Sequence, residues 1–128
     1  MTKNTKVNAA ILIIGNEILS GRTKDTNTST LATWLNTIGV KVEEVRVIPD
    51  IEKTIVDTLN FLRTNYDYVF TSGGIGPTHD DITAESVSKA FGIKYEMHKE
   101  AFKILQVYYK SGEFNEGRQK MVWMPENA

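Results

Sequence analysis

Hydrophobic residues in this chain fall into short runs separated by helical and turn-rich segments. The longest run, Ala9–Ile14, is continuously apolar and ends at Gly15. Such a run predicts a strand that is buried on both faces, as in a parallel sheet. Segment 40–47 alternates valine with polar residues but slips phase at Glu43-Glu44. This pattern predicts a half-buried strand with a bulge or an edge position in the sheet.

Helical periodicity marks the segments between the strands. Apolar residues recur at helical spacing in 28–38, where Gly39 is expected to end the helix, and again around 55–62. We expect further helices over 83–91 and 99–110. The residues expected to face the core are Leu31, Leu35, Ile38, Ile55, Leu59, Leu62, Val87, Ala90 and Phe91.

Segments 68–71 and 93–97 predict a third and a fourth strand, and 115–122 predicts a short final helix. Alternating strands and helices are typical of an α/β fold with an open, mostly parallel sheet and helices on both faces. The polar residues 1–8 are expected to form a flexible N-terminus before a single domain. In such folds ligands bind beyond the carboxyl ends of the strands, here residues 15–27, 48–50 and 72–81.

The glycine-rich segment from Ser72 to Asp81 is the strongest local signal. Three glycines, Gly73, Gly74 and Gly76, stand within four residues and allow backbone N–H groups to converge on an anion. A following helix would aim its N-terminus at the same point. An ordinary tight turn between a strand and a helix is the alternative interpretation.

Acidic residues accompany these loops. Asp80 and Asp81 beside an anion cradle suggest a divalent cation such as Mg²⁺ shared with phosphates, or acids that favour a helix N-terminus. Asp50 lies on the same expected rim, either as a ligand or as the N-cap of the next helix. Glu17 has the chemistry to accept hydrogen bonds from a heterocycle or to hold a metal. Asn27 can cap a helix and also face the pocket.

Composition narrows the classes of partner. Fifteen Lys+Arg and sixteen Asp+Glu give a net charge of −1, so no basic excess favours a nucleic acid polymer or an anionic membrane. No apolar run approaches the ~20 residues needed to span a bilayer. The absence of cysteine excludes disulfides and thiolate zinc sites. A cytoplasmic location is the default expectation.

The motifs carry a family resemblance. Gly15-x-Glu17-x-Leu19-x-Gly21 with Asn27 resembles the opening G-x-E-L-L-x-G…N of CinA-type molybdopterin-binding domains. Thr71-x-Gly73-Gly74-x-Gly76-Pro77, followed by Asp81-Ile82-Thr83, is similar to the signature of the wider MoaB/MogA/gephyrin superfamily. Ile48-Pro49-Asp50 resembles the short element that precedes the second helix of that superfamily.

The resemblance implies a three-layer α/β/α sandwich with a rim pocket for a pterin-phosphate, such as molybdopterin, or for a nucleotide. It implies that Asp50 and Asp81 are the carboxylates associated with a metal such as Mg²⁺ and with catalysis. Glu17 and Asn27 would belong to the CinA-like version of the pocket. The residues that it assigns to ligand or phosphate binding are Gly15, Glu17, Asn27, Ser72, Gly73, Gly74, Gly76, Pro77 and Thr78.

Several functions remain compatible with these motifs. The first is a domain that binds a pterin-phosphate or nucleotide, in molybdenum cofactor biosynthesis. The alternatives are a molybdopterin adenylyltransferase, a metal-dependent pyrophosphatase acting on ADP-ribose-type nucleotides, and a non-catalytic binding or assembly subunit. Homo-oligomerisation is expected from the resemblance and from Met121, Trp123 and Met124. The family chain continues into another strand beyond the equivalent of Ala128, so we expect residues 9–128 to lack that strand.

Overall fold

The computed structural model describes residues 6–128, so residues 1–5 of the expected flexible segment lie outside the described residues. The first strand, β1 (Val7–Ile14), begins two residues before the apolar run. Val7 and Asn8 therefore belong to the sheet rather than to a flexible N-terminus. The backbone of Asn8 donates to the Asp67 carboxylate at 3.0 Å, which holds this end of the strand in place.

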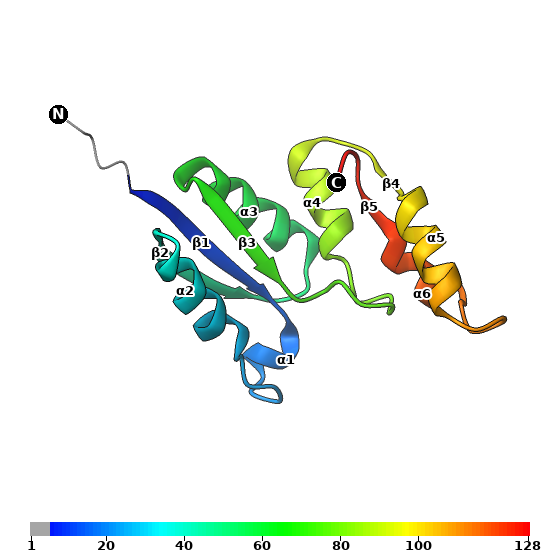
Figure 1. The fold of residues 1–128 in the computed structure, drawn as a ribbon. Coiled ribbons are helices and arrows are strands. Elements are labelled where there is room, and N and C mark those ends of the chain that lie inside the picture. The colour runs from blue at the N-terminus through cyan, green and yellow to red at the C-terminus, as the bar shows by residue number, and fades with distance from the viewer. Residues whose placement is uncertain (1–5) are drawn as a thin grey trace.

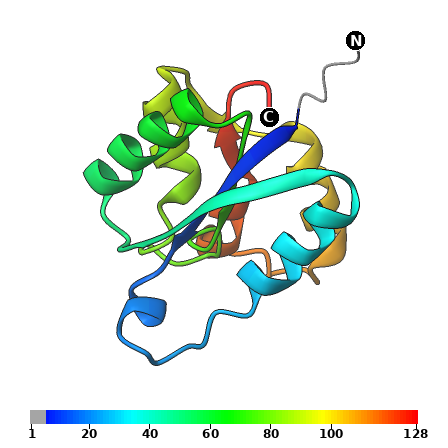
Figure 2. The same cartoon turned by 90° about the vertical axis from the view of Figure 1, so that its left-hand side faces the viewer.

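Three parallel strands form the main sheet in the order β2-β1-β3, with β2 (Val40–Ile48) and β3 (Tyr68–Ser72) on either side of β1. Helix α2 (Asn27–Thr37) covers one face and α3 (Glu52–Asn65) covers the other (Figure 2). Residues 9–14 are at most 3% exposed, because both faces of β1 are covered. The predicted three-layer α/β/α architecture is confirmed.

The side chains of β1 divide between the two faces. Ala10, Leu12 and Ile14 form one core cluster with Ile55, Leu59 and Leu62 of α3, as the helical spacing predicted. On the opposite face the α2 residue Leu35 is buried. Ile38 lies just beyond the C-terminal end of α2 and is 55% exposed, so its predicted place in the core is wrong.

Strand β2 is an edge strand of this sheet and contains the predicted bulge. Ala9 pairs with Val42, but Ala10 pairs with Glu44, so Glu43 is the extra residue. The bulge keeps the valines on both sides of it on the same face of the sheet. Glu44 instead points toward α3, where it accepts a hydrogen bond from the Tyr66 hydroxyl at 2.7 Å.

Helix α4 (Thr83–Phe91) packs both on α3 and on the short strand β5 (Trp123–Pro125). Gly92 ends it in the left-handed conformation, as predicted. Because both sides of α4 are covered, Ser86 and Ser88 are buried, and each hydroxyl donates to a carbonyl of its own helix or its N-terminal flank. Phe91 is 47% exposed, with Arg63 stacked over its ring, so its predicted inward position is wrong.

The fourth strand does not join the parallel sheet as predicted. Strand β4 (Tyr95–Met97) pairs antiparallel with β5, and the two form a separate ribbon. Helix α4 stands between α3 and this ribbon, so the chain cannot return to the sheet at this point (Figure 1). The remaining elements are α5 (Lys99–Tyr108), α6 (Glu116–Gln119) and the 3₁₀ turn η1 (Lys120–Val122). Within residues 6–128, no helix has both the length and the apolar character needed to cross a membrane.

Candidate functional site

The three loops singled out by the sequence meet at one edge of the sheet, where β1, β2 and β3 end (Figure 1). The N–H of Gly15 donates to the carbonyl of Ile48 at 3.0 Å, which joins the first loop to the second. A Cβ atom on Gly73 would lie 2.0 Å from the carbonyl oxygen of Ile14. The third loop therefore passes directly against the end of β1, and only glycine fits there.

Asp50 and Asn16 hold the first two loops together. The N–H of Asn16, at the start of the one-turn helix α1 (Asn16–Leu19), donates to Asp50 Oδ2 at 3.0 Å. The N–H of Asp50 donates in return to Asn16 Oδ1 at 3.3 Å. Asp50 does not cap the helix that follows it, as the alternative interpretation proposed, because α3 has no side-chain cap. Nothing in the sequence pattern signalled Asn16.

The third loop, residues 72–81, is called the glycine loop below. Its shape depends on the backbone conformation of two glycines and on hydrogen bonds from Thr83. Gly73 has φ +97° and Gly74 has φ +68°, in the left-handed region that glycine occupies without strain. The Thr83 hydroxyl donates to the Gly73 carbonyl at 2.8 Å, and its N–H donates to the Gly74 carbonyl at 3.1 Å. Among residues 6–128, no group accepts a hydrogen bond from the N–H of Gly74 or of Ile75. Those two donors are available to an anion.

Asp81 stabilises the C-terminal part of the glycine loop by accepting hydrogen bonds within it. Its Oδ2 accepts hydrogen bonds from the N–H and the hydroxyl of Thr78, both at 2.9 Å. Burial by itself raises the pKa of the Asp81 carboxyl, but hydrogen bonds from Thr78 and Gly76 and the charge of Lys120 outweigh burial and lower the pKa below its ordinary value. Asp81 is therefore ionised at neutral pH and contributes a negative charge beside the loop.

A cavity of about 410 Å³ lies between the first loop and the glycine loop. Glu17 lines it, and among residues 6–128 no group donates a hydrogen bond to its carboxylate. Asn27 lines it too, and its side-chain amide donates to the Ser72 hydroxyl at 2.9 Å. This contact joins the start of α2 to the end of β3. The complete lining is Ile13, Ile14, Glu17, Ile18, Thr23, Lys24, Asp25, Thr26, Asn27, Ser72, Gly73 and Ile75.

Asn27 does not cap α2, contrary to one of its two predicted roles. Asp25 does so instead, because its Oδ1 accepts from the N–H of Asn27 at 3.0 Å and of Thr28 at 3.3 Å. The Thr28 hydroxyl also bonds to Asp25, and this hydrogen bond is the main cause that lowers the pKa of the Asp25 carboxyl. An aspartate two residues before a helix was a signal available in the sequence.

A second cavity, of about 220 Å³, lies on the other side of the glycine loop. Tyr95 and Trp123 form one wall, with ring centroids 5.6 Å apart. Lys120 also lines this cavity, and its ammonium group donates to the Thr78 carbonyl. The sequence did not indicate Lys120, which approaches the loop from 42 residues further along the chain. The other residues lining it are Gly74, Ile75, Gly76, Asp81, Ala84, Met121 and Met124.

The two carboxylates assigned to a metal lie at different ends of the glycine loop. Asp50 Oδ1 is 3.4 Å from the position of a Cβ on Gly74, whereas Asp81 Oδ2 is 2.8 Å from that of a Cβ on Gly76. No group of three or more His, Asp or Glu side chains suited to a metal occurs among the described residues. A cation held by Asp50 or Asp81 would therefore need most of its ligands from groups other than these side chains.

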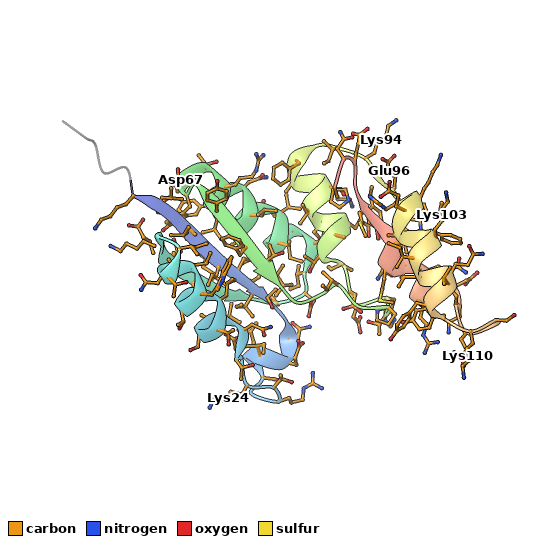
Figure 3. The ribbon with its side chains drawn as sticks, viewed as in Figure 1. Lys24, Asp67, Lys94, Glu96, Lys103 and Lys110 are labelled. Atoms are coloured by element: carbon orange, nitrogen blue, oxygen red, sulfur yellow. The ribbon has the colours of Figure 1, made fainter. Side chains whose placement is uncertain are left out.

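The remaining sequence candidates line neither cavity. Gly15 is buried beneath Glu17, and a Cβ there would lie 2.6 Å from Glu17 Oε1. Pro77 and Thr78 face α6 and η1 instead, because the Pro77 carbonyl approaches Gly117 and the Thr78 carbonyl accepts from Lys120. One basic residue does line the larger cavity: Lys24, which Figure 3 shows at the outer end of the loop between α1 and α2.

Comparison with known proteins identifies the domain. The family model described as "Probable molybdopterin binding domain" matches residues 10–126. A protein of Pyrobaculum calidifontis is 38% identical over 122 residues, which cover 94% of this chain and 47% of the relative. A protein of Saccharolobus islandicus strain M.16.27 is 38% identical over 123 residues, with 94% and 47% covered. The chain thus spans about half the length of these relatives.

Solved structures agree with this assignment. The CinA protein of Thermoplasma acidophilum, described as having unknown function, matches with a TM-score of 0.87 and 32% identity, over 93% of this chain and 70% of that one. The molybdopterin biosynthesis enzyme MoaB of Thermus thermophilus has a TM-score of 0.64 at 20% identity, over 90% and 71% of the two chains, and shows the shared fold. The chain belongs to the molybdopterin-binding domain family and is similar within it to CinA.

Proposed function

We propose that this domain binds a phosphate-bearing heterocycle, either a pterin-phosphate such as molybdopterin or a nucleotide, at the edge of the sheet. The observation that carries the proposal is the pair of N–H groups of Gly74 and Ile75, which have no acceptor among the described residues. Ile75 lines both cavities, so an anion bound at this peptide would be within reach of groups from either one.

The side chains that line the larger cavity can form hydrogen bonds and apolar contacts with the heterocycle. Glu17 offers a carboxylate to ring N–H and amino groups, and Asn27 offers an amide held in place by Ser72. Apolar wall area comes from Ile13, Ile14 and Ile18. Polar groups set among apolar side chains are typical of a small-molecule site. The family membership and the MoaB neighbours named for molybdopterin or tungsten cofactor synthesis support molybdopterin as the first ligand to test.

A divalent cation such as Mg²⁺ would be held jointly by ligand phosphate and by Asp50 or Asp81. Asp50 uses Oδ2 for Asn16, and its Oδ1 faces Gly74. Asp81 is ionised at neutral pH. The cation would neutralise phosphate charge, which favours both binding and any reaction at a phosphoanhydride.

Phosphoanhydride chemistry is the second candidate, favoured by the ionised Asp81 carboxylate beside the loop. It takes one of two forms: transfer of AMP from ATP to the phosphate of molybdopterin with release of pyrophosphate, or attack of water on the phosphoanhydride of an ADP-ribose-type nucleotide, which releases two monophosphates. Assays of both, each with and without Mg²⁺, distinguish them by product. Loss of about 10²-fold in rate in Asp81→Asn, with binding retained, would support a catalytic role, whereas an unchanged rate would reject it.

Isothermal titration calorimetry tests the binding proposal directly. The folded protein is titrated with molybdopterin, AMP and ADP-ribose, each with and without Mg²⁺. We expect at least one ligand to bind with a Kd below about 1 mM, and Glu17→Gln and Asn27→Ala to weaken it about tenfold, or about 1.4 kcal/mol. Asn36→Ala, an exposed residue further along α2, is the matched control. Failure of every ligand to bind the folded protein would overturn the proposal.

A further inference from the structure

The ammonium group of Lys120 has unused hydrogen-bond donors beside the glycine loop. An ammonium carries three donors, and one of them bonds to the Thr78 carbonyl. Among residues 6–128 the group donates to no other acceptor and forms no salt bridge. Lys120 is half-buried and lines the smaller cavity together with Gly74 and Ile75. Its charge is therefore available to an anion bound at the N–H groups of those two residues.

The fold fixes the backbone that carries Lys120. Lys120 is the first residue of η1, and Val122 in the same turn is fully buried. The Val122 carbonyl accepts a hydrogen bond from the N–H of His98 at 2.7 Å, which attaches the turn to the start of α5. Strand β5 follows directly and pairs with β4. An ordered backbone therefore presents this side chain to the loop, which reduces the conformational entropy lost when an anion binds.

The two cavities differ in the charges of the side chains that line them. In the larger cavity two acids, Glu17 and Asp25, oppose one base, Lys24. Among residues 6–128 no group donates to the Glu17 carboxylate, so its charge would repel a phosphate. The described residues that line the smaller cavity include one acid, Asp81, and one base, Lys120. The charges therefore favour phosphate in the smaller cavity and a ring with N–H groups in the larger.

Two further acids, Glu85 and Glu116, lie near Lys120 but outside the smaller cavity. They line a neighbouring surface hollow with Tyr95, Trp123 and Lys120, and no residue of the glycine loop lines that hollow. Neither glutamate forms a salt bridge with Lys120. Their charges reduce the attraction of this site for an anion, but their side chains do not occupy the place of a phosphate.

Building on the proposed function, we infer that the phosphate of the ligand lies in the smaller cavity, bound jointly by Lys120 and by the N–H groups of Gly74 and Ile75. The heterocycle then occupies the larger cavity. The ligand crosses the glycine loop at Ile75, which lines both cavities. Lys120 is a ligand-binding residue in this arrangement, although it lies 42 residues along the chain from the loop residue that its ammonium contacts.

An NMR titration of the isotope-labelled protein with inorganic phosphate tests this assignment without assuming a heterocycle. The amide resonances of Gly74 and Ile75 should shift, and sodium chloride of equal ionic strength should not reproduce the shifts. Lys120→Gln removes the charge but keeps a donor for the Thr78 carbonyl, and it should weaken phosphate binding about tenfold. Lys120→Arg keeps the charge and should weaken it less.

Lys94→Gln is the matched control. It removes an equal charge from an exposed residue that does not line the smaller cavity (Figure 3), and it should leave phosphate binding unchanged. Thermal unfolding and the amide resonances of Thr78 and Asp81 establish that each variant retains the loop.

The possible failures of this inference and of the proposed function are distinct. Unchanged phosphate affinity in Lys120→Gln, or an equal loss in Lys94→Gln, would overturn the assignment of Lys120 while the Gly74 and Ile75 amides still responded to phosphate. An absence of any response at these two amides in the unaltered protein would reject the inference together with the anion site on which the proposed function rests.

Discussion

Asp50 and Asn16 exchange two hydrogen bonds across the edge of the sheet, from Asn16 N–H to Asp50 Oδ2 at 3.0 Å and from Asp50 N–H to Asn16 Oδ1 at 3.3 Å. The exchange ties the end of β2 to the turn of helix that carries Glu17. Asp50 therefore positions a residue of the larger cavity, and its second carboxylate oxygen remains beside Gly74. A substitution at Asp50 is expected to affect both the fold and the ligand.

Asp50→Ala should lower the free energy of unfolding by about 1 kcal/mol, because it leaves the Asn16 N–H without its acceptor. Ligand affinity should fall as well, since α1 loses its anchor. Asp50→Asn keeps an oxygen that can accept from Asn16 and should cost less stability. Urea unfolding and calorimetry measure the two effects. Equal stability of Asp50→Ala and the unaltered protein would show that the exchange does not hold the loops.

Gly73→Ala should destabilise the protein far more than Gly39→Ala. Both glycines have positive φ, +97° and +85°, so both substitutions carry the cost of the left-handed conformation, about 1–2 kcal/mol. A Cβ on Gly39 would meet nothing within 4 Å, whereas one on Gly73 would lie 2.0 Å from the Ile14 carbonyl oxygen. Thermal unfolding compares the two variants. Similar melting temperatures would mean that the glycine loop can move away from β1.

Lowering the pH should reduce the free energy of unfolding, in part because the Asp81 carboxylate becomes protonated. Its carboxyl has a lowered pKa, so its contribution to stability is complete above the ordinary value of 3.8 and is lost as the pH falls through the lower value of the folded state. Asp81→Asn should therefore cost more stability at pH 7 than in acid, where the carboxyl is protonated in the folded and in the unfolded state alike. Urea unfolding at a series of pH values measures this difference.

Thr78→Val, which removes one of the two Thr78 donors to Asp81, should reduce the same dependence in part. Thr64→Val is the control, because the Thr64 hydroxyl donates to the Asn60 carbonyl rather than to an acid. If Asp81→Asn destabilised the protein equally across the whole pH series, the hydrogen bonds to the ionised carboxylate would not be the source of its effect.

Asp25→Ala should loosen the start of α2. The variant loses the acceptor for the N–H groups of Asn27 and Thr28, and the loss of such a cap typically costs about 1 kcal/mol. Because Asn27 lies in the first turn, ligand binding should weaken too. Hydrogen exchange of the α2 amides measures the change. Thr26→Ala, in which no side-chain cap is removed, should exchange as the unaltered protein does.

The sequence predicted correctly those features that depend only on residues close together in the chain. The apolar run before Gly15, the phase slip at Glu43-Glu44 and the stop at Gly92 each specify a structure within a few residues of themselves, and the structure confirms all three. The order of three glycines also located the third loop. Where a single short segment determines the conformation, the sequence alone was sufficient.

Contacts between distant segments could not be predicted in this way. Strands β4 and β5 have three residues each, too few to show an alternating pattern, and their antiparallel pairing depends on where α4 packs. Burial of Ser86 and Ser88 depends on the same packing, because helical spacing assigns an inward face only when one side of a helix is covered. Lys120 reaches the site only through the fold.

The bulge at Glu43 also determines where one residue can be deleted from β2 without shifting the residues that follow. Removing Glu43 would leave Val42 followed by Glu44, which already pair with the consecutive residues Ala9 and Ala10. The shortened strand would alternate without interruption, and Ile48 would still pair with Ile14. Removing a residue after Glu44 would instead shift Asp50 by one position relative to the rest of the sheet. A gap at Glu43 is therefore the one-residue deletion in the middle of this strand that a relative could carry while keeping Asp50 beside Gly74.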